Sequence, residues 1–164
     1  MTISIANPLP ALPRAADPVN SRLIIVGCCP RKRVTRHPVP ALDLYDEGCI
    51  PPLRARLGTN PRLRNRIRIL SARHGLVHAD TPLLAYDQAL DADTAARLRP
   101  AVTATLADDL AATGTPCEVL AIVEPLYLVL IADLLTTGAR VHWVPDYFTG
   151  WPEASAVLDS WSWT

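Results

Sequence analysis

The sequence predicts an α/β domain of three layers, with a central, mostly parallel sheet of about four strands flanked by helices. Two observations carry this prediction. Short apolar, β-branched runs such as residues 23–33 (LIIVGCCPRKR) and 68–76 (RILSARHGL) stop abruptly at small or polar residues, which is typical of buried strands. Segments with the apolar spacing of helices lie between such runs. The length of 164 residues and the apolar content of 49% suit one domain with a substantial core.

The expected elements follow in chain order. Four prolines within residues 1–21 indicate an extended or disordered arm, so the single α/β domain is expected over residues 22–164. The segments expected to be strands are 22–28, 67–71, 118–123 and 140–144. The segments expected to be helices are 41–47, 52–57, 61–65, 93–112, 126–137 and 152–159. Residues 77–90 show turn residues and no clear periodicity, which predicts a loop.

The longest expected helix has the clearest signals. Asp93 is a good N-cap, and Leu98, Val102 and Leu106 recur at every fourth residue. Pro100 lies inside this pattern, and we expect it either to kink the helix or to mark the start of its longer part.

Composition excludes several classes of protein. No apolar run reaches the roughly 18 residues that span a bilayer, and the N-terminus lacks the pattern of a secretory signal, so we expect a cytoplasmic protein with no membrane partner. None of the four cysteines forms a Cys-x-x-Cys pair, which argues against a structural zinc site and favours reduced thiols. We expect no bound metal and no cofactor.

The charges are unevenly distributed along a chain of zero net charge. Residues 1–75 hold 13 Lys and Arg against 4 Asp and Glu, whereas residues 76–164 hold 3 against 12. This asymmetry predicts either a basic face that binds phosphates or two halves that pair with each other on folding. The arginines between positions 54 and 68 could also form a solvated face.

Ligands of open α/β sheets bind just beyond the carboxyl ends of the strands, and two such ends carry reactive residues. The first strand is followed by Cys29, Arg31 and Lys32, which suit an anionic ligand, although the turn lacks the spacing of a phosphate-binding loop. An ordinary basic turn is the alternative. Cys29 is a nucleophile only if its pKa is lowered, and a small apolar role is the commoner one.

The second strand end supplies Ser71, Arg73 and His74. His74 is a candidate general acid or base, although a lone histidine is more often a structural hydrogen-bonding residue. We expect the two strand ends to lie side by side and to open onto one shared hollow.

Two tyrosines and two carboxylates complete the candidate site. Tyr45 and Tyr86 each neighbour an acidic residue and could stack on a base or bind a sugar, or be half-buried packing residues. Asp87 and Asp146 could orient water or a ribose hydroxyl. Four late tryptophans indicate core packing or the face of a homodimer.

Four blocks in this order resemble a family of small bacterial proteins distantly related to the peroxide stress protein YaaA. The blocks are CCPRK at 28–32, PALDLY at 40–45, ILSARHGL at 69–76 and YDQAL at 86–90. The resemblance spans about residues 22–90 and is weaker after the last strand, where VPDYFTG at 144–150 keeps only the proline and one glycine of the family pattern.

A more distant likeness, carried by the GCCP turn at 27–30, is to the uracil-DNA-glycosylase-like superfamily, which includes a domain of archaeosine synthase. The water-activating acid of that superfamily's first motif is missing here. Both resemblances imply a partner that is a nucleotide, nucleoside or nucleic acid, without by themselves implying bond cleavage.

The sequence therefore predicts a nucleotide- or nucleobase-binding protein that acts on an N-glycosidic bond. In this hypothesis Arg31, Lys32 and Arg73 hold phosphate, Asp87 or Asp146 orients water, and His74 supports the leaving base. The alternative is a non-catalytic nucleic-acid-binding or stress-response protein that grips phosphates with its basic half. A thiol redox protein is a third class, based only on the adjacent cysteines at 28 and 29.

Overall fold

The computed structural model describes residues 17–164, so residues 1–16 of the predicted arm lie outside the described residues. The central feature is a five-stranded sheet with the strand order β4-β3-β1-β6-β7. Its strands are β1 (Arg22–Gly27), β3 (Ile67–Ser71), β4 (Gly75–His78), β6 (Glu118–Ile122) and β7 (Arg140–Val144). All neighbouring pairs are parallel except β3 and β4. The predicted α/β class with a mostly parallel sheet is confirmed.

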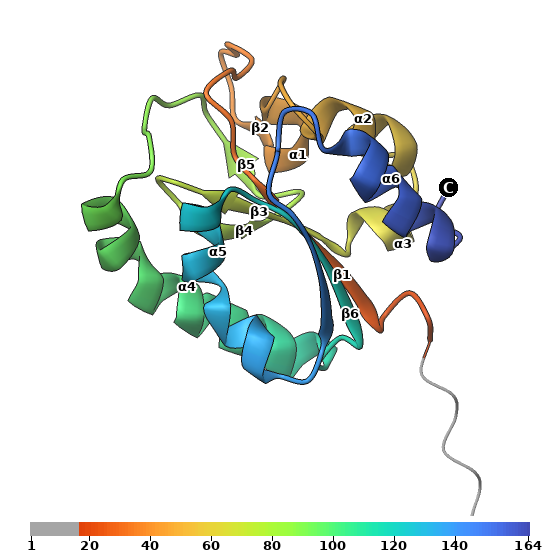
Figure 1. Cartoon of the computed structure of the whole chain (residues 1–164). Coiled ribbons are helices and arrows are strands. Elements are labelled where there is room, and N and C mark those ends of the chain that lie inside the picture. The colour runs from red at the N-terminus through yellow and green to blue at the C-terminus, as the bar shows by residue number, and fades with distance from the viewer. Residues whose placement is uncertain (1–16) are drawn as a thin grey trace, which may run out of the picture.

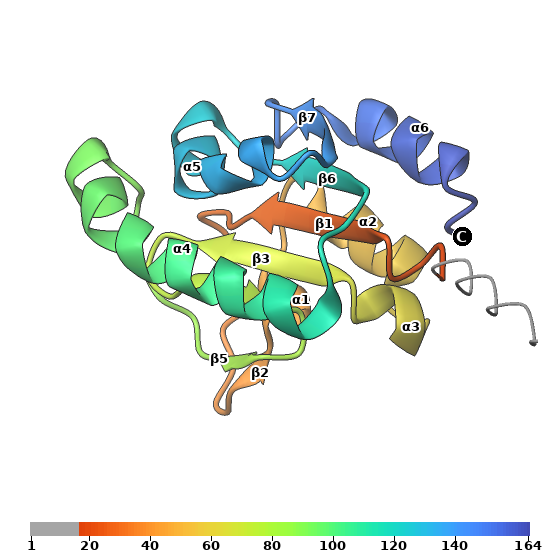
Figure 2. The same cartoon turned by 90° about the horizontal axis from the view of Figure 1, so that it is seen from below.

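Helices cover both faces of the sheet and make three layers (Figures 1 and 2). The helical elements are α1 (Ala41–Leu44), α2 (Ile50–Leu57), α3 (Pro61–Arg64), α4 (Ala92–Thr113), α5 (Pro125–Leu130), the 3-10 helix η1 (Ala132–Thr136) and α6 (Trp151–Ser160). A hydrophobic core lies on each face of the sheet, and alternate residues of β1 point into one or the other. Ile25 packs on the α4–α5 side, and Ile24 packs on the side of α1, α2 and α6. This alternation of a fully buried strand explains the unbroken apolar run in its sequence.

The segment at 77–90 is not the single loop that we expected. Gly75 has a φ of +71° and turns the chain straight back, so that β4 pairs antiparallel with β3. Farther on, β5 (Pro82–Leu83) pairs antiparallel with β2 (Val39–Pro40) in a separate two-stranded sheet. Strands of four and two residues are too short to show a period of two in the sequence.

Two helix predictions also need correction. α4 runs through Pro100 without interruption, so this proline does not mark the helix start; a proline removes one backbone hydrogen bond, and the buried Val102 and Leu106 hold the helix on the sheet. The helix expected over 126–137 is divided, because Ile131 leaves the helical conformation and the chain continues as η1.

The arginines between positions 54 and 68 do not form a solvated face. Arg54 binds Asp46, Arg64 binds Asp43 and Asp80, and a bidentate ion pair joins the buried Arg68 of β3 to Asp109 of α4. Other arginines of this run pair in the same way; they are Arg56 with Asp159 and Arg62 with Asp17. Five of the six arginines of this run, all except the buried Arg66, are thus paired with carboxylates of the fold.

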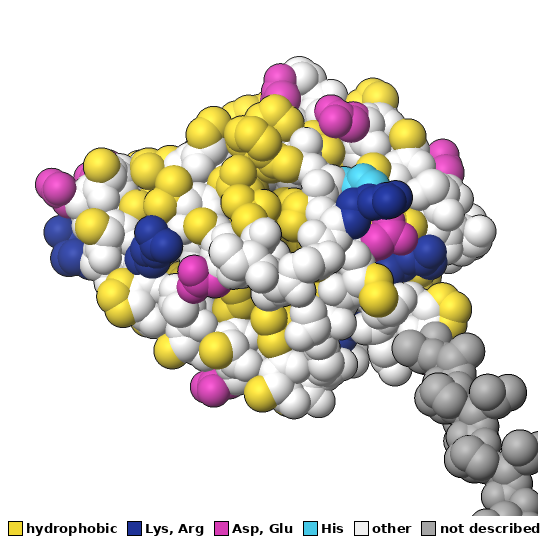
Figure 3. All heavy atoms as spheres, turned by 60° about the horizontal axis from the view of Figure 1, so that its bottom comes forward, with side chains coloured by type: hydrophobic (Ala, Val, Ile, Leu, Met, Phe, Trp, Pro, Cys, Tyr) yellow, Lys and Arg dark blue, Asp and Glu magenta, His cyan; other side chains and the backbone are white. Residues whose placement is uncertain are grey.

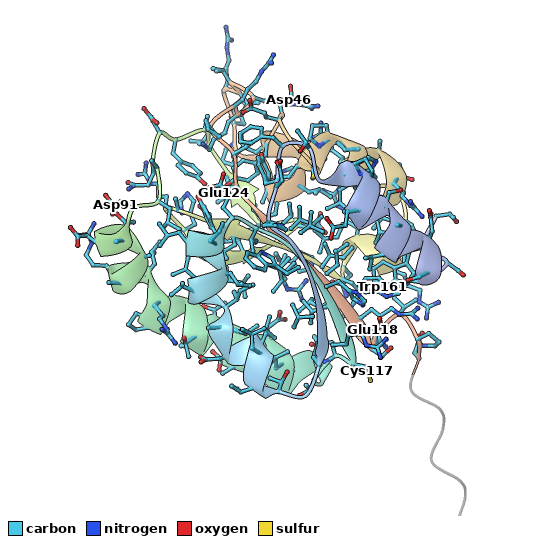
Figure 4. The ribbon with its side chains drawn as sticks, in the orientation of Figure 1. Asp46, Asp91, Cys117, Glu118, Glu124 and Trp161 are labelled. Carbon is cyan, nitrogen blue, oxygen red and sulfur yellow. The ribbon has the colours of Figure 1, made fainter. Side chains whose placement is uncertain are left out.

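The amino ends of the strands carry a polar cluster of their own. The Glu118 carboxylate accepts hydrogen bonds from His142 Nε2 at 2.8 Å and Trp161 Nε1 at 3.2 Å, and Arg22 Nε lies 3.6 Å away. The hydrogen bond from His142, assisted by Trp161 and the charge of Arg22, holds the pKa of Glu118 below its ordinary value. Figure 4 shows Glu118 and Trp161 together at this end.

The tryptophans have divided roles. Trp161 and Trp163 are buried in the core, as the packing interpretation expects. Trp143, on the edge strand β7, is 39% exposed, and Val129 and Leu135 are exposed as well. Figure 3 shows hydrophobic side chains gathered on the face that it brings forward.

Candidate functional site

A cavity of about 210 Å³ lies at the carboxyl ends of β1, β6 and β7. Its walls come from the turn after β1, the loop before α4, the start of α5 and the turn after β7. The lining residues are Cys28, Cys29, Pro30, Lys32, Asp87, Gln88, Ala89, Leu90, Glu124, Tyr127, Tyr147 and Phe148. This is the edge at which open α/β sheets bind ligands. Pockets for drug-sized ligands measure about 300–1,000 Å³, so this smaller cavity suits a single ring system or a nucleoside.

One wall is fixed by a close backbone approach. Gly48 has a φ of +67°, and a Cβ added there would lie 2.6 Å from the Tyr147 ring. The Tyr147 hydroxyl donates to Glu47 O at 2.9 Å, and Cys49 N donates to Tyr147 O at 3.1 Å. Only glycine combines this φ with this space, so the connection between α1 and α2 holds the aromatic wall in place.

Two carboxylates face the cavity without a partner. Asp87 and Glu124 are exposed, and neither side chain makes a hydrogen bond or an ion pair within residues 17–164. Figure 4 shows Glu124 at the end of the molecule that also carries Asp46 and Asp91, opposite Cys117 and Glu118. Unpaired carboxylates in a cavity can accept N–H or O–H donors of a ligand or stabilise a developing positive charge.

Lys32 supplies the one amine of the cavity lining. Its Nζ donates to Cys29 O at 2.9 Å and to Pro30 O at 3.3 Å. An ammonium group has three donors, so one remains for a ligand. The same Nζ lies 4.2 Å from the centre of the Tyr86 ring, a cation–π distance.

The two adjacent cysteines differ in their surroundings. Cys28 is half-buried and lines the cavity; its sulfur accepts a hydrogen bond from Ala72 N at 3.4 Å and lies 3.1 Å from Tyr127 OH, within hydrogen-bond distance. Cys29 is 2% exposed, and its thiol donates to Arg31 O at 3.0 Å. Burial raises the pKa of the Cys29 thiol, which favours the structural interpretation of this residue over the nucleophilic one.

Ser71, Tyr86 and Tyr45 form a chain of hydroxyl groups behind the cavity. Ser71 Oγ accepts from the backbone N–H groups of Arg73 and His74, so its own proton is donated to Tyr86 OH at 2.5 Å. Tyr86 OH lies 2.6 Å from Tyr45 OH. Burial raises the pKa of both tyrosines, and both hydroxyls therefore stay protonated at neutral pH.

Arg73 and His74 line a second hollow of about 410 Å³ with Pro38, Leu84 and Tyr86. The two strand ends are neighbours, as predicted, since Ala72 N donates to Cys28 Sγ. They do not open onto one hollow, however: Arg73, His74 and Tyr86 line the second hollow, and none of them lines the cavity beside Cys28 and Cys29. Burial and the charge of Arg73 lower the pKa of His74, so its ring is neutral at neutral pH.

Asp146 does not line the cavity. Its carboxylate accepts from the backbone N–H groups of Phe148 at 3.0 Å and Thr149 at 2.9 Å, and from the Thr149 hydroxyl. The bond from that hydroxyl, with the backbone bonds, lowers the pKa of Asp146. This carboxylate shapes the turn after β7 and lies in a shallower hollow with Glu124.

Arg31 stands in the chain between the lining residues Pro30 and Lys32 but does not itself line the cavity, and its side chain is exposed. Its backbone joins the wall, since Asp46 N donates to Arg31 O at 3.1 Å and Arg31 N donates to Glu47 Oε2 at 3.4 Å. Its guanidinium group has no hydrogen bond or ion pair to any described residue, so it is available to a ligand.

Of the lining residues, sequence reasoning named Cys29, Lys32 and Asp87 as site residues, and among those that it missed are Glu124, Tyr127, Tyr147 and Phe148. The signal for Glu124 was present, because it lies two residues after the end of β6 and precedes Pro125, and the strand-end rule applies to β6 as it does to β1. The two aromatic residues after β7 follow from the same rule.

Searches against protein-family models, curated proteins and solved structures each gave no match. The resemblance to YaaA relatives and to uracil-DNA-glycosylase-like proteins therefore stays a prediction. In the part of the chain that the structure describes, no three His, Cys, Asp or Glu side chains are grouped so that they could hold a metal ion. No helix among residues 17–164 combines the length and apolar character of a membrane span.

Proposed function

We propose that the protein binds a nucleobase or nucleoside in the cavity at the ends of β1, β6 and β7, and that it hydrolyses the N-glycosidic bond. The observation that carries this proposal is the combination, in one small cavity, of aromatic rings with a carboxylate that has no partner in the protein. Phe148 is 50% exposed and meets Tyr147 edge to face, with 4.9 Å between the ring centres. An exposed ring of this kind offers a stacking surface to a planar base.

Glu124 is the residue that we assign to the chemistry. Departure of a base leaves positive charge on the sugar, and a carboxylate in a small site stabilises such charge. In the proposed reaction a water oxygen bonds to C1′ while the bond from C1′ to the base nitrogen breaks. The bonding pair and one proton go to the base, and the products are the free base and the sugar.

The other lining residues have binding roles in this proposal. Lys32 has one free donor for an oxygen of the base or phosphate, and Asp87 can accept from sugar hydroxyls. Tyr45, Ser71 and Tyr86 support the wall behind Lys32. The chemical roles predicted for His74 and Asp146 are not proposed again, because neither lines this cavity.

The second candidate is a non-catalytic nucleic-acid-binding protein. It is favoured by the exposed Arg31, Arg36 and Arg73, whose side chains have no ion pair to any of residues 17–164. Binding by phosphate contacts alone would fall steeply with salt and release no base.

The cellular setting is also part of the proposal. All four cysteines are free thiols, which suits a reducing compartment such as the cytoplasm. The homodimer and the stress-response role stay predictions.

The test is a chromatographic assay for free base with a panel of ribo- and deoxyribonucleosides and their monophosphates. We expect release of base from at least one substrate, and a loss of about 10²–10⁴-fold in the rate with Glu124→Gln. Glu153→Gln is the matched control, because Glu153 is an exposed residue of α6 outside the cavity. Absence of released base across the panel, or an unchanged rate with Glu124→Gln, would contradict the proposal.

A further inference from the structure

We infer that the ligand spans both hollows and consists of two nucleotides, whose linking phosphate binds between Lys32 and Arg73. This inference rests on the proposed function and adds a second subsite to it. It starts from the position of Tyr86, which lines the second hollow and whose ring is also approached by Lys32 of the cavity lining.

Two cations converge on this one ring from the two hollows. Lys32 Nζ lies 4.2 Å and the Arg73 guanidinium carbon 5.9 Å from the ring centre of Tyr86. Neither cation has a carboxylate within ion-pair distance among the residues that the structure describes. Two positive charges that share one neighbour and lack a counter-ion create a site for an anion.

The contrast with the other arginines strengthens this point. Arg54, Arg64 and Arg68 are each neutralised by aspartates of the fold. Arg73, like the exposed Arg31 and Arg36, has no such partner among residues 17–164, and of these three it is the one within cation–π distance of Tyr86. A guanidinium group without a carboxylate partner can bind a phosphate through two parallel N–H donors.

The second hollow has the chemistry of a base-binding surface. No carboxylate lines it, whereas Asp87 and Glu124 line the first. Leu84 is 48% exposed there, and the neutral ring of His74 stands edge-on to Tyr86 at 5.1 Å. Apolar and aromatic side chains of this kind support a second planar base by stacking.

The proposed ligand is a pair of nucleotides joined through phosphate. Such a pair can be two successive nucleotides of a single-stranded nucleic acid or a free dinucleotide. Calorimetric titration tests it with a mononucleotide, a phosphodiester-linked dinucleotide, a trinucleotide and a pyrophosphate-linked dinucleotide. We expect the phosphodiester dinucleotide to bind at least about 10-fold more tightly than the mononucleotide, the equivalent of one phosphate contact with modest stacking. A further gain with the trinucleotide indicates a strand, and equal binding of the pyrophosphate form indicates a free dinucleotide.

Two variants locate the contact. Arg73→Ala should remove most of the gain of the dinucleotide and lower the slope of log K against log salt by about 0.7, the value for one phosphate of a single strand. His74→Ala should weaken the dinucleotide and leave the mononucleotide unchanged. Arg140→Ala is the matched control, because Arg140 is exposed, lies at the amino end of β7 and has no side-chain partner among residues 17–164.

The outcomes separate this inference from the proposed function. Equal affinities for mononucleotide and dinucleotide, or an unchanged gain in Arg73→Ala, would overturn the second subsite while the activity on nucleosides stands. Failure of both ligands to bind would overturn the proposed function and the inference together.

Discussion

Replacing Tyr86 by phenylalanine tests the buried hydroxyl chain that supports the site. The Tyr86 hydroxyl lies 2.5 Å from Ser71 Oγ and 2.6 Å from Tyr45 OH. Tyr86→Phe removes both bonds but keeps the ring that lines the second hollow. Tyr45 is fully buried, so its hydroxyl would be left without a partner.

The magnitude follows from the partners that are left. A buried hydroxyl without a hydrogen bond costs about 1–3 kcal/mol, and the lost bond of Ser71 costs about 0.5–1.5 kcal/mol. Tyr86→Phe should therefore lower the free energy of unfolding by about 2–4 kcal/mol, or Tm by roughly 5–15 °C for a chain of this length. Tyr45→Phe leaves Tyr86 bonded to Ser71 and should cost only about 0.5–1.5 kcal/mol.

The double variant Tyr45→Phe/Tyr86→Phe gives the decisive comparison. Since it removes the stranded hydroxyl, it should be about 1 kcal/mol more stable than Tyr86→Phe alone. Urea denaturation, followed by tryptophan fluorescence, measures all three variants. A double variant that is less stable than Tyr86→Phe would refute the reasoning.

Three further predictions concern the frame around the site. Asp109→Ala leaves Arg68 buried and unpaired and should cost about 3–5 kcal/mol in urea denaturation, whereas a loss under about 1 kcal/mol would contradict the account. The lowered pKa of Glu118 contributes stability that is present above the ordinary carboxyl pKa and is lost as the pH falls through the pKa of the folded state. Glu118→Gln should therefore flatten the decline of Tm below about pH 5. An identical decline in the variant and the wild type would argue against a stabilising role of the Glu118 carboxylate. Gly48→Ala forces a Cβ against Tyr147 and should lower both Tm and ligand affinity. Gly138→Ala, at a φ of +83°, imposes backbone strain but brings its Cβ against no atom, so it should cost less in Tm and leave ligand affinity unchanged; equal effects of the two would count against the wall assignment.

The sequence was most informative where burial dictates the pattern. β1 and β6 are enclosed on both faces, and their apolar runs predicted them to within a residue or two. The hairpin at β3 and β4 was missed because a four-residue strand carries almost no periodic signal. The turn between β3 and β4 depends on the positive φ of Gly75, and a single glycine after a histidine in the sequence does not predict such a turn.

The candidate site was predicted in part for the same reason. The strand-end rule located Lys32 at the cavity and Ser71 behind it, whereas Tyr86 was predicted from its place beside Asp87. The sequence could not show that the two strand ends open onto different hollows, because that depends on three-dimensional packing. Asp146 shows the opposite case. Its carboxylate follows a strand, but its oxygens accept hydrogen bonds from Thr149 within the same turn, so it does not contribute to the cavity.

The most direct test of the central claim is a crystal structure of the Glu124→Gln variant with a nucleoside that the wild-type protein cleaves or binds. The account predicts the base against Phe148 and Tyr147, with the sugar beside position 124 and Lys32 in contact with the ligand. A nucleoside bound at another surface, with this cavity free of ligand at saturating concentration, would contradict it.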